Sequence, residues 1–153
     1  MTRTRSGRTA RGGRLLVIAD EHPSDVLAEE ECRRLLGSSG IGRLGFTRGA
    51  LPEVRPVSFT VRGDEVVIPA RLGSATLAAL TGTVVVLAVD SWAQQGRTAD
   101  DAGGWAVSVV GLVRLDPGLP GGTSSGDLRQ LRLLPGIVRG WRVRPAADGP
   151  HGE

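Results

Sequence analysis

An arginine and two hydroxyl side chains lie close together between two apolar segments of this 153-residue chain. Arg71 precedes the pair Gly73-Ser74, and Thr76 follows two residues later. A guanidinium, two hydroxyl groups and the free backbone N–H groups at the start of a short helix suit the binding of a phosphate, and a glycine lets a ligand approach the backbone. Most Gly-Ser helix starts are no more than caps, so a purely structural role is the alternative interpretation.

Other reactive side chains are few. His22 and His151 are the only histidines and Cys32 is the only cysteine, which argues against a metal site or a Ser-His-Asp triad and excludes an internal disulfide. No P-loop occurs, and no GxGxxG sequence follows a strand pattern. We therefore expect no metal and a reducing, cytoplasmic location. The three tryptophans are interpreted as core or subunit-interface anchors, with cofactor contact as the alternative.

The charge of the chain is unevenly distributed. Five of the 19 basic residues, all arginine, lie in residues 1–14, whereas from residue 15 onward 14 arginines face 16 acidic residues. Residues 1–14 are expected to be a disordered tail, 15–145 one domain and 146–153 a flexible end. A nucleic-acid-binding arm is the less favoured interpretation of the tail. No apolar run is long enough for a signal peptide or a membrane helix, so we expect no membrane partner.

Short elements must position the candidate phosphate site. Residues 27–36 predict a helix that Gly37 ends, with Cys32 as a small core residue, and residues 75–80 predict a second helix capped by Ser74. Alternating apolar and polar residues, or short apolar runs, predict six strands. These are residues 41–47, 53–61, 65–68, 83–89, 105–115 and 137–143.

The predicted strands follow one another without the alternation of strands and helices that parallel sheets require. The first three are expected to form an antiparallel meander, in which Pro56 marks an edge or an irregular point. Residues 83–89 are apolar after the first, which predicts burial on both faces, and Gly111 allows a bulge or a close approach. The fold class is therefore mainly β, a small closed or partly closed six-stranded antiparallel barrel with short helices.

The order of these pieces resembles actinobacterial proteins of the pyridoxamine 5′-phosphate oxidase-like family. The resemblance covers residues 27–115 and rests on six blocks. They are EECRRLL at 30–36, IGRLGF at 41–46, RPVSF at 55–59, Gly-Ser at 73–74, Val-Asp at 89–90 and GWAVSVVG at 104–111.

The resemblance implies a split β-barrel that forms a homodimer, with FMN, or in some relatives a deazaflavin coenzyme, in two clefts between the subunits. It implies an FMN-dependent oxidoreductase that acts on a small-molecule substrate. A protein that binds a flavin, a deazaflavin or another planar ligand without turnover is the alternative. Ala75, which stands where many family members have a lysine, favours that alternative.

The resemblance also implies which residues contact the cofactor. One strand would lie along the isoalloxazine ring, with Arg55 near its polar edge, and residues from Ile68 to Arg71 would continue that wall. Arg71, Ser74 and Thr76 would hold the phosphate, and Trp105 of the other subunit would close the cleft. The strand residues are Arg55, Pro56, Val57, Ser58 and Phe59.

Overall fold

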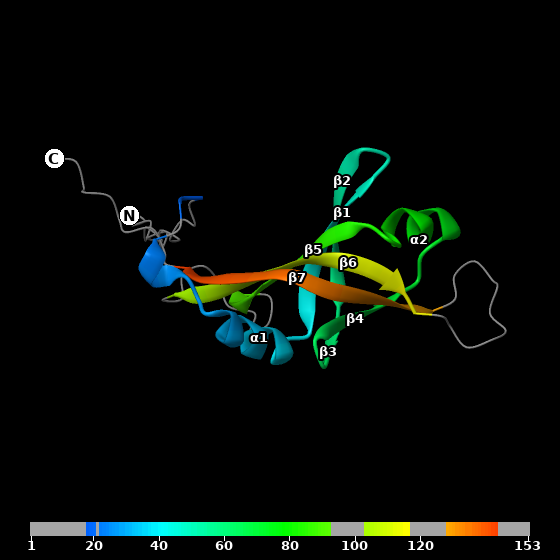
Figure 1. Cartoon of the computed structure of the whole chain (residues 1–153). Helices are drawn as coiled ribbons and strands as arrows, with labels where there is room; N and C mark the ends of the chain where they lie inside the picture. The colour runs from blue at the N-terminus through cyan, green and yellow to red at the C-terminus, as the bar shows by residue number, and fades with distance from the viewer. Residues whose placement is uncertain (1–17, 21, 93–102, 117–127, 144–153) are drawn as a thin grey trace, which may run out of the picture.

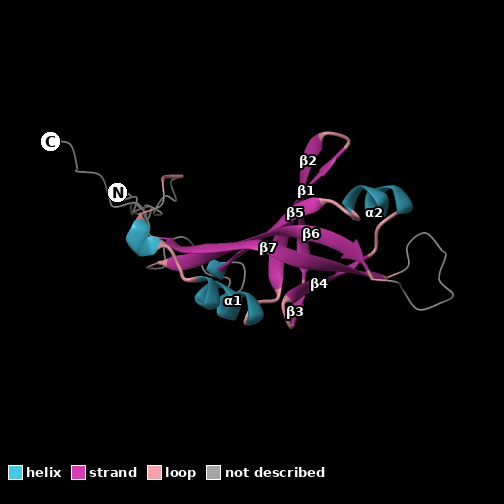
Figure 2. Cartoon of the chain, viewed as in Figure 1, coloured by secondary structure: helices cyan, strands magenta, loops and turns pink. Residues whose placement is uncertain are grey.

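The computed structural model describes residues 18–20, 22–92, 103–116 and 128–143, and these parts form one curled antiparallel sheet with short helices (Figures 1 and 2). The strands are β1 (Ile41–Arg48), β2 (Leu51–Ser58), β3 (Thr60–Arg62), β4 (Glu65–Ala70), β5 (Val84–Asp90), β6 (Gly104–Leu115) and β7 (Arg129–Val143). The helices are η1 (Pro23–Asp25), α1 (Glu29–Gly37) and α2 (Ser74–Leu80). The predicted tails, 1–14 and 146–153, lie outside the described residues.

The strand order β2-β1-β5-β6-β7-β4-β3 explains how the sheet curls. β2 and β3 lie at its two opposite edges, yet only Phe59 separates them along the chain. At this corner the Phe59 backbone N–H donates to the Gly40 carbonyl, at 2.9 Å, and the Phe59 ring is buried. The sheet must therefore bend round until its edges meet at one residue, which gives a split barrel.

The mainly β class is confirmed, but the predicted strand pairing and strand number are wrong. Residues 53–61 are not one strand of a meander, because the chain changes partner at Phe59: β2 pairs with β1, whereas β3 pairs with β4. β4 then pairs with β7, so the sheet has seven strands rather than six. Pro56 lies in the edge strand β2, where the missing N–H costs no sheet hydrogen bond.

The core lies on the inner face of the curled sheet, where alternate residues of each strand point. Its strand residues are Leu44, Phe46, Val66, Ile68, Val85, Leu87, Val89, Val107, Val109, Val113, Leu131 and Leu133. α1 adds Cys32, Leu35 and Leu36, and α2 adds Leu80. Cys32 is fully buried, and burial raises the pKa of its thiol, so it is a core residue as predicted.

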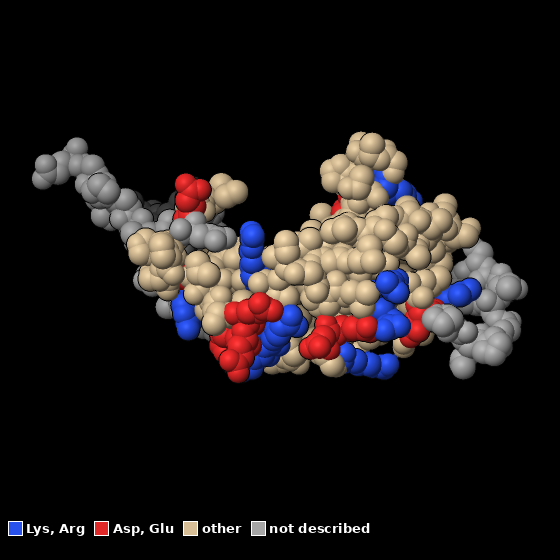
Figure 3. All heavy atoms as spheres, viewed as in Figure 1, with Lys and Arg blue, Asp and Glu red and all other residues tan. Residues whose placement is uncertain are grey.

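The outer face of β5 corrects the expectation that residues 83–89 are buried on both sides. Val85, Leu87 and Val89 are buried, but Val84 and Val86 are 64% and 37% exposed. A continuous apolar run thus has one face in the core and the other on the surface of the single chain. In Figure 3 the face over β6 and β7 is also largely free of charged side chains, which gather along the side of α1, β3 and β4.

β6 and β7 form the longest ladder of the sheet, and its register shifts between Val110 and Gly111. A Cβ atom at Gly111 would overlap the Leu134 carbonyl, so the predicted bulge with a close approach is confirmed. β7 begins at Arg129 rather than at residue 137, because the irregular register accommodates the Pro-Gly pair at 135–136 inside a strand. No described helix is long and apolar enough to cross a membrane.

Candidate functional site

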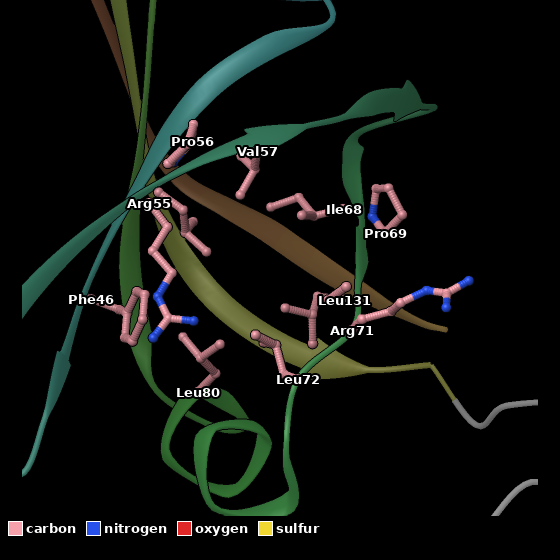
Figure 4. Close-up of a pocket in the computed structure, with 12 residues that line it drawn as sticks. Phe46, Arg55, Pro56, Val57, Ile68, Pro69, Arg71, Leu72, Leu80 and Leu131 are labelled. Atoms are coloured by element: carbon pink, nitrogen blue, oxygen red, sulfur yellow. The ribbon is translucent and has the colours of Figure 1, made fainter. Parts of the chain in front are cut away.

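A pocket of about 180 Å³ opens between the β1–β2 hairpin, β4 and α2 (Figure 4). It lies where β2 and β4 face each other without sheet hydrogen bonds, which is the split of the barrel. Its lining residues are Leu44, Phe46, Arg55, Pro56, Val57, Ile68, Pro69, Ala70, Arg71, Leu72, Leu80 and Leu131. The walls are apolar except for two guanidinium groups, so the pocket suits a flat, largely apolar group with a polar edge.

The two guanidinium groups point differently. The Arg55 guanidinium carbon lies 5.7 Å from the centre of the Phe46 ring, and its Nη2 lies 3.0 Å from Glu53 Oε2. Figure 4 shows this guanidinium between Phe46 and Leu80, whereas the Arg71 side chain extends away from the other lining residues. Arg55 is thus held at the pocket by a cation–π contact and an ion pair.

The structure brings together five of the ten predicted cofactor residues at this pocket, namely Arg55, Pro56, Val57, Ile68 and Arg71. Two others on the same chain segment face elsewhere. Ser58 is exposed on the opposite face of β2, and the Phe59 ring is buried at the corner of the sheet. The alternation of the strand predicts that Ser58 faces away from Val57, but it puts Phe59 on the same face as Val57. Phe59 leaves that face because β2 ends at Ser58.

The start of α2 differs from the prediction. Gly73 is the N-cap residue, and Ser74, which is exposed, is the first residue of the helix, with no side-chain capping hydrogen bond. Gly73 has an extended backbone, and its carbonyl accepts the first helical hydrogen bond from Leu77 N at 3.0 Å, so it fills the cap position by itself. A Cβ atom at Gly73 would meet nothing within 4 Å. The backbone there is open to a ligand from outside the chain.

Thr76, in contrast, is only 8% exposed, and its Oγ1 accepts a hydrogen bond from Arg48 Nη1 at 3.2 Å. Arg48 also pairs with Glu53, with 2.9 Å between Nε and Oε1. The predicted strands, 41–47 and 53–61, leave Arg48 in the connection between them, and sequence reasoning gave Glu53 no role. The two-residue period of residues 44, 46 and 48 is the signal that could have placed Arg48 on the inner face.

Trp105 does not line the pocket of its own chain. Its side chain packs against the core, and its backbone N–H donates to Ser91 Oγ at 3.2 Å. Its predicted contact with the cofactor of a second subunit stays a prediction. Within the described residues, no group of three or more His, Cys, Asp or Glu side chains could hold a metal ion.

An ion pair links β4, which forms one wall of the pocket, to its neighbour β7. Arg132 on β7 donates to Glu65 on β4, with distances of 2.7 Å from Nε to Oε2 and 2.6 Å from Nη2 to Oε1. These hydrogen bonds hold the pKa of Glu65 below its usual range and raise that of Arg132. The pair joins the two strands that bring Ile68 and Leu131 into the pocket.

Comparison with known proteins identifies the family. Residues 28–116 match the family model described as pyridoxamine 5'-phosphate oxidase. The chain therefore belongs to this family, as the resemblance of its sequence blocks implied. The matched segment contains the pocket except for Leu131, together with Arg48, Glu53 and α2.

Individual relatives agree with this assignment. An uncharacterized protein of Mycobacterium tuberculosis is 37% identical over 91 residues, which are 56% of this chain and 57% of that protein. The structure of the FAD binding protein from Mycobacterium smegmatis is similar with a TM-score of 0.61 and 25% identity, covering 78% of this chain and 97% of that one. An FAD-binding protein from Mesorhizobium loti, at 18% identity and a TM-score of 0.57, shares the fold over 77% of this chain and 96% of its own.

Proposed function

We propose that this chain binds a flavin in the pocket at the barrel split and acts as an FMN-dependent oxidoreductase on a small molecule. The observation that carries the proposal is the apolar pocket with the Arg55 guanidinium fixed over Phe46. Membership of the pyridoxamine 5'-phosphate oxidase family supports it. FAD is the second candidate cofactor, because similar structures belong to FAD-binding proteins, and a deazaflavin coenzyme is the third.

The residues present fit a flat heteroaromatic ring. Val57 and Ile68 face the pocket from β2 and β4 and supply apolar walls for the two faces of such a ring. β2 is an edge strand of the described sheet, so outward C=O groups along it, and the outward N–H groups of its non-proline residues, are available to the polar edge of the ring. We assign the ring to Arg55, Pro56, Val57 and Ile68, without Ser58 and Phe59, which face elsewhere, and the phosphate to the side of Arg71, Ser74 and Thr76.

A second copy of the chain completes this site in the proposal. Five strands place one residue each in a row across the outer face of the sheet: Val54, Gly45, Val86, Val110 and Ile137. Three of these side chains are more than a third exposed. This row of four apolar side chains and one glycine across five strands is a surface that association would bury. We propose that it is the homodimer interface and that Trp105 of the partner closes the cleft.

The residues that line the pocket indicate what the chain itself would contribute beside a bound flavin. When bound, a flavin supplies hydride transfer at its ring, chemistry that belongs to the cofactor. The chain's own residues bind and orient: apolar walls exclude water, and Arg55 places a positive charge at the pocket. Because the described lining contains no carboxylate, histidine or thiol, a flavin-binding protein without turnover is the second candidate function.

The visible absorption spectrum tests the proposal. The purified protein is mixed with FMN, or in parallel with FAD, and excess flavin is removed by gel filtration. Retained flavin bands at about one per subunit are expected. A colourless protein that retains neither flavin would contradict flavin binding. If flavin is retained, a substrate screen under reducing and oxidising conditions distinguishes an enzyme from a protein that binds flavin without turnover.

The dimer has its own test. Val86→Asp places a carboxylate in the centre of the apolar row, so we expect a monomer by light scattering and weaker flavin retention. Arg62→Asp, at an exposed position of β3, is the matched control and should leave the dimer intact. A wild-type protein that is monomeric at micromolar concentration would overturn the intersubunit site.

A further inference from the structure

The inner face of the β1–β2 hairpin changes from apolar to charged as it leaves the core. Leu44 and Phe46 are buried, and Arg48 follows on the same face. On the paired strand, Glu53 lies opposite Phe46, and Arg55 lies opposite Leu44. Residues of this face normally point into the core. Three charged side chains therefore continue this face beyond the core residues, and each of them stays partly exposed.

One carboxylate is shared by two guanidinium groups in this cluster. Glu53 Oε1 lies 2.9 Å from Arg48 Nε, and its Oε2 lies 3.0 Å from Arg55 Nη2. The cluster therefore carries a formal charge of one positive unit. Because Glu53 is only 25% exposed and pairs with both arginines, it lowers the repulsion between them and holds the Arg48 guanidinium near Arg55, which lines the pocket.

Arg48 is also fixed from the side of α2. Its Nη1 donates to Oγ1 of Thr76 at 3.2 Å, and that threonine is nearly buried. Two anchors on opposite sides hold the guanidinium plane, while 46% of the side chain stays exposed. A guanidinium has five N–H donors, so the two contacts leave donors that face outward. A planar group fixed in this way is preorganised for two parallel hydrogen bonds to a phosphate.

We propose that Arg48, held by Glu53 and Thr76, binds the phosphate group of the flavin. This inference rests on the proposed function and adds a residue to its site. Arg55, on the other side of Glu53, faces the pocket that would hold the ring, so the cluster joins the place of the ring to that of the phosphate. A phosphate monoester at Arg48 then neutralises the positive unit that the cluster carries.

The test compares FMN with riboflavin, which has the same ring and no phosphate. Dissociation constants for both are measured by fluorescence titration with wild type, Arg48→Gln, Arg48→Lys and Arg62→Gln. Loss of a charge-assisted contact predicts a rise of about tenfold in the FMN constant of Arg48→Gln and no change for riboflavin. Arg48→Lys keeps the charge without the planar fork, so it should fall between wild type and Arg48→Gln. Arg62→Gln should match wild type.

Two results would overturn the inference while flavin binding stands. One is an Arg48→Gln protein that binds FMN as well as wild type. The other is an equal loss for FMN and riboflavin, which would mean that Arg48 only supports the fold. Thermal unfolding of each variant with pyrophosphate separates the two proposals. If wild type binds no flavin but pyrophosphate raises its Tm, and Arg48→Gln abolishes that rise, the anion site stands and the flavin function falls.

Discussion

Two short helices pack against the same sheet, one in close contact with it and the other beside a pocket. α1 buries Cys32, Leu35 and Leu36, and a Cβ atom at Gly140 of β7 would lie 2.6 Å from Cys32 Sγ. α2 buries Thr76 and Leu80 and borders a pocket of about 180 Å³. Figure 1 shows the helices at separate places along the sheet, α1 beside β3 and β7 and α2 beside the β1–β2 hairpin.

The difference lies in what each helix presents to the sheet. The inward side chains of α1 are apolar, and a glycine on the facing strand lets the helix approach closely, so this contact is tightly packed. α2 presents a threonine to an arginine, and a polar pair of this kind keeps its surroundings partly open to water. The α1 side therefore stabilises the fold, and the α2 side is the one available for a ligand.

The largest effect is expected from Gly140→Ala. The new methyl group would meet Cys32 Sγ and, at 3.0 Å, the Ala106 carbonyl, so the free energy of unfolding should fall by about 3 kcal/mol. In Gly73→Ala, on the α2 side, the new methyl group meets nothing within 4 Å, so the free energy of unfolding should change by less than about 0.5 kcal/mol. Urea unfolding at neutral pH measures both.

A double substitution sharpens this contrast. Cys32→Ala removes the sulfur that the new methyl group meets, so it should recover part of the loss in Gly140→Ala. If the two substitutions instead add without any recovery, then the contact between α1 and β7 is not what limits the space at Gly140.

Leucine truncation should give the next largest effect. Leu36→Ala in α1 leaves a sealed cavity and should cost about 3 kcal/mol, whereas Leu80→Ala in α2 enlarges an existing pocket and should cost about 2 kcal/mol. Only Leu80→Ala is expected to change flavin affinity. If the two leucine substitutions have equal effects on both stability and flavin binding, then the proposed distinction between a stabilising helix and a helix that borders the ligand pocket is wrong.

A smaller effect concerns retention of the cofactor. Arg71 lies at the rim of the pocket, and its charge is proposed to help hold the phosphate. Arg71→Ala should therefore weaken flavin retention after gel filtration by a few-fold, about what a solvent-exposed ionic contact contributes. Arg62→Ala, on the side of β3 and α1, should retain flavin like wild type. Equal losses in the two variants would refute the assignment of Arg71.

The smallest effect is a dependence on pH. The Arg132 hydrogen bonds lower the pKa of Glu65 in the folded chain below its ordinary value of 4.5. The Glu65–Arg132 pair therefore contributes fully to the stability of the fold at pH values above the ordinary pKa of Glu65. This contribution is lost as the pH falls through the lowered pKa. Glu65→Gln should be less stable than wild type at pH 7, and the difference should vanish in acid. Glu31→Gln, whose partner Arg34 is on the same helix, should show a weaker form of this effect.

The sequence predicted most of the local structure because local patterns determine it. Alternation located the strands of residues 41–47 and 105–115, and the spacing of Cys32, Leu35 and Leu36 located α1 and its buried face. The blocks of sequence also identified the family, which the family comparison confirmed. The pocket residues Arg55, Val57 and Ile68 were named for the same reason.

Apart from the cap of α2, which is Gly73 rather than Ser74, the main errors concern which segments meet. A strand pattern does not say when the chain changes partner, so the break at Phe59 was missed. An apolar run does not say how many layers cover it, so Val84 and Val86 were expected to be buried. Local rules for turns assigned Arg48 to a connection, although its side chain reaches Thr76, which is 28 residues further along the chain.

By itself, then, the sequence determined the elements, the class of fold and the family, since backbone propensity and side-chain period act over a few residues. Only the tertiary structure decided that a pocket lies beside α2. Curling the sheet brings the β1–β2 hairpin against α2, and a hydrogen bond between residues 48 and 76 depends on that approach in space. Long-range contacts of this kind arise from the closure of the barrel as a whole, and no short window of sequence contains them.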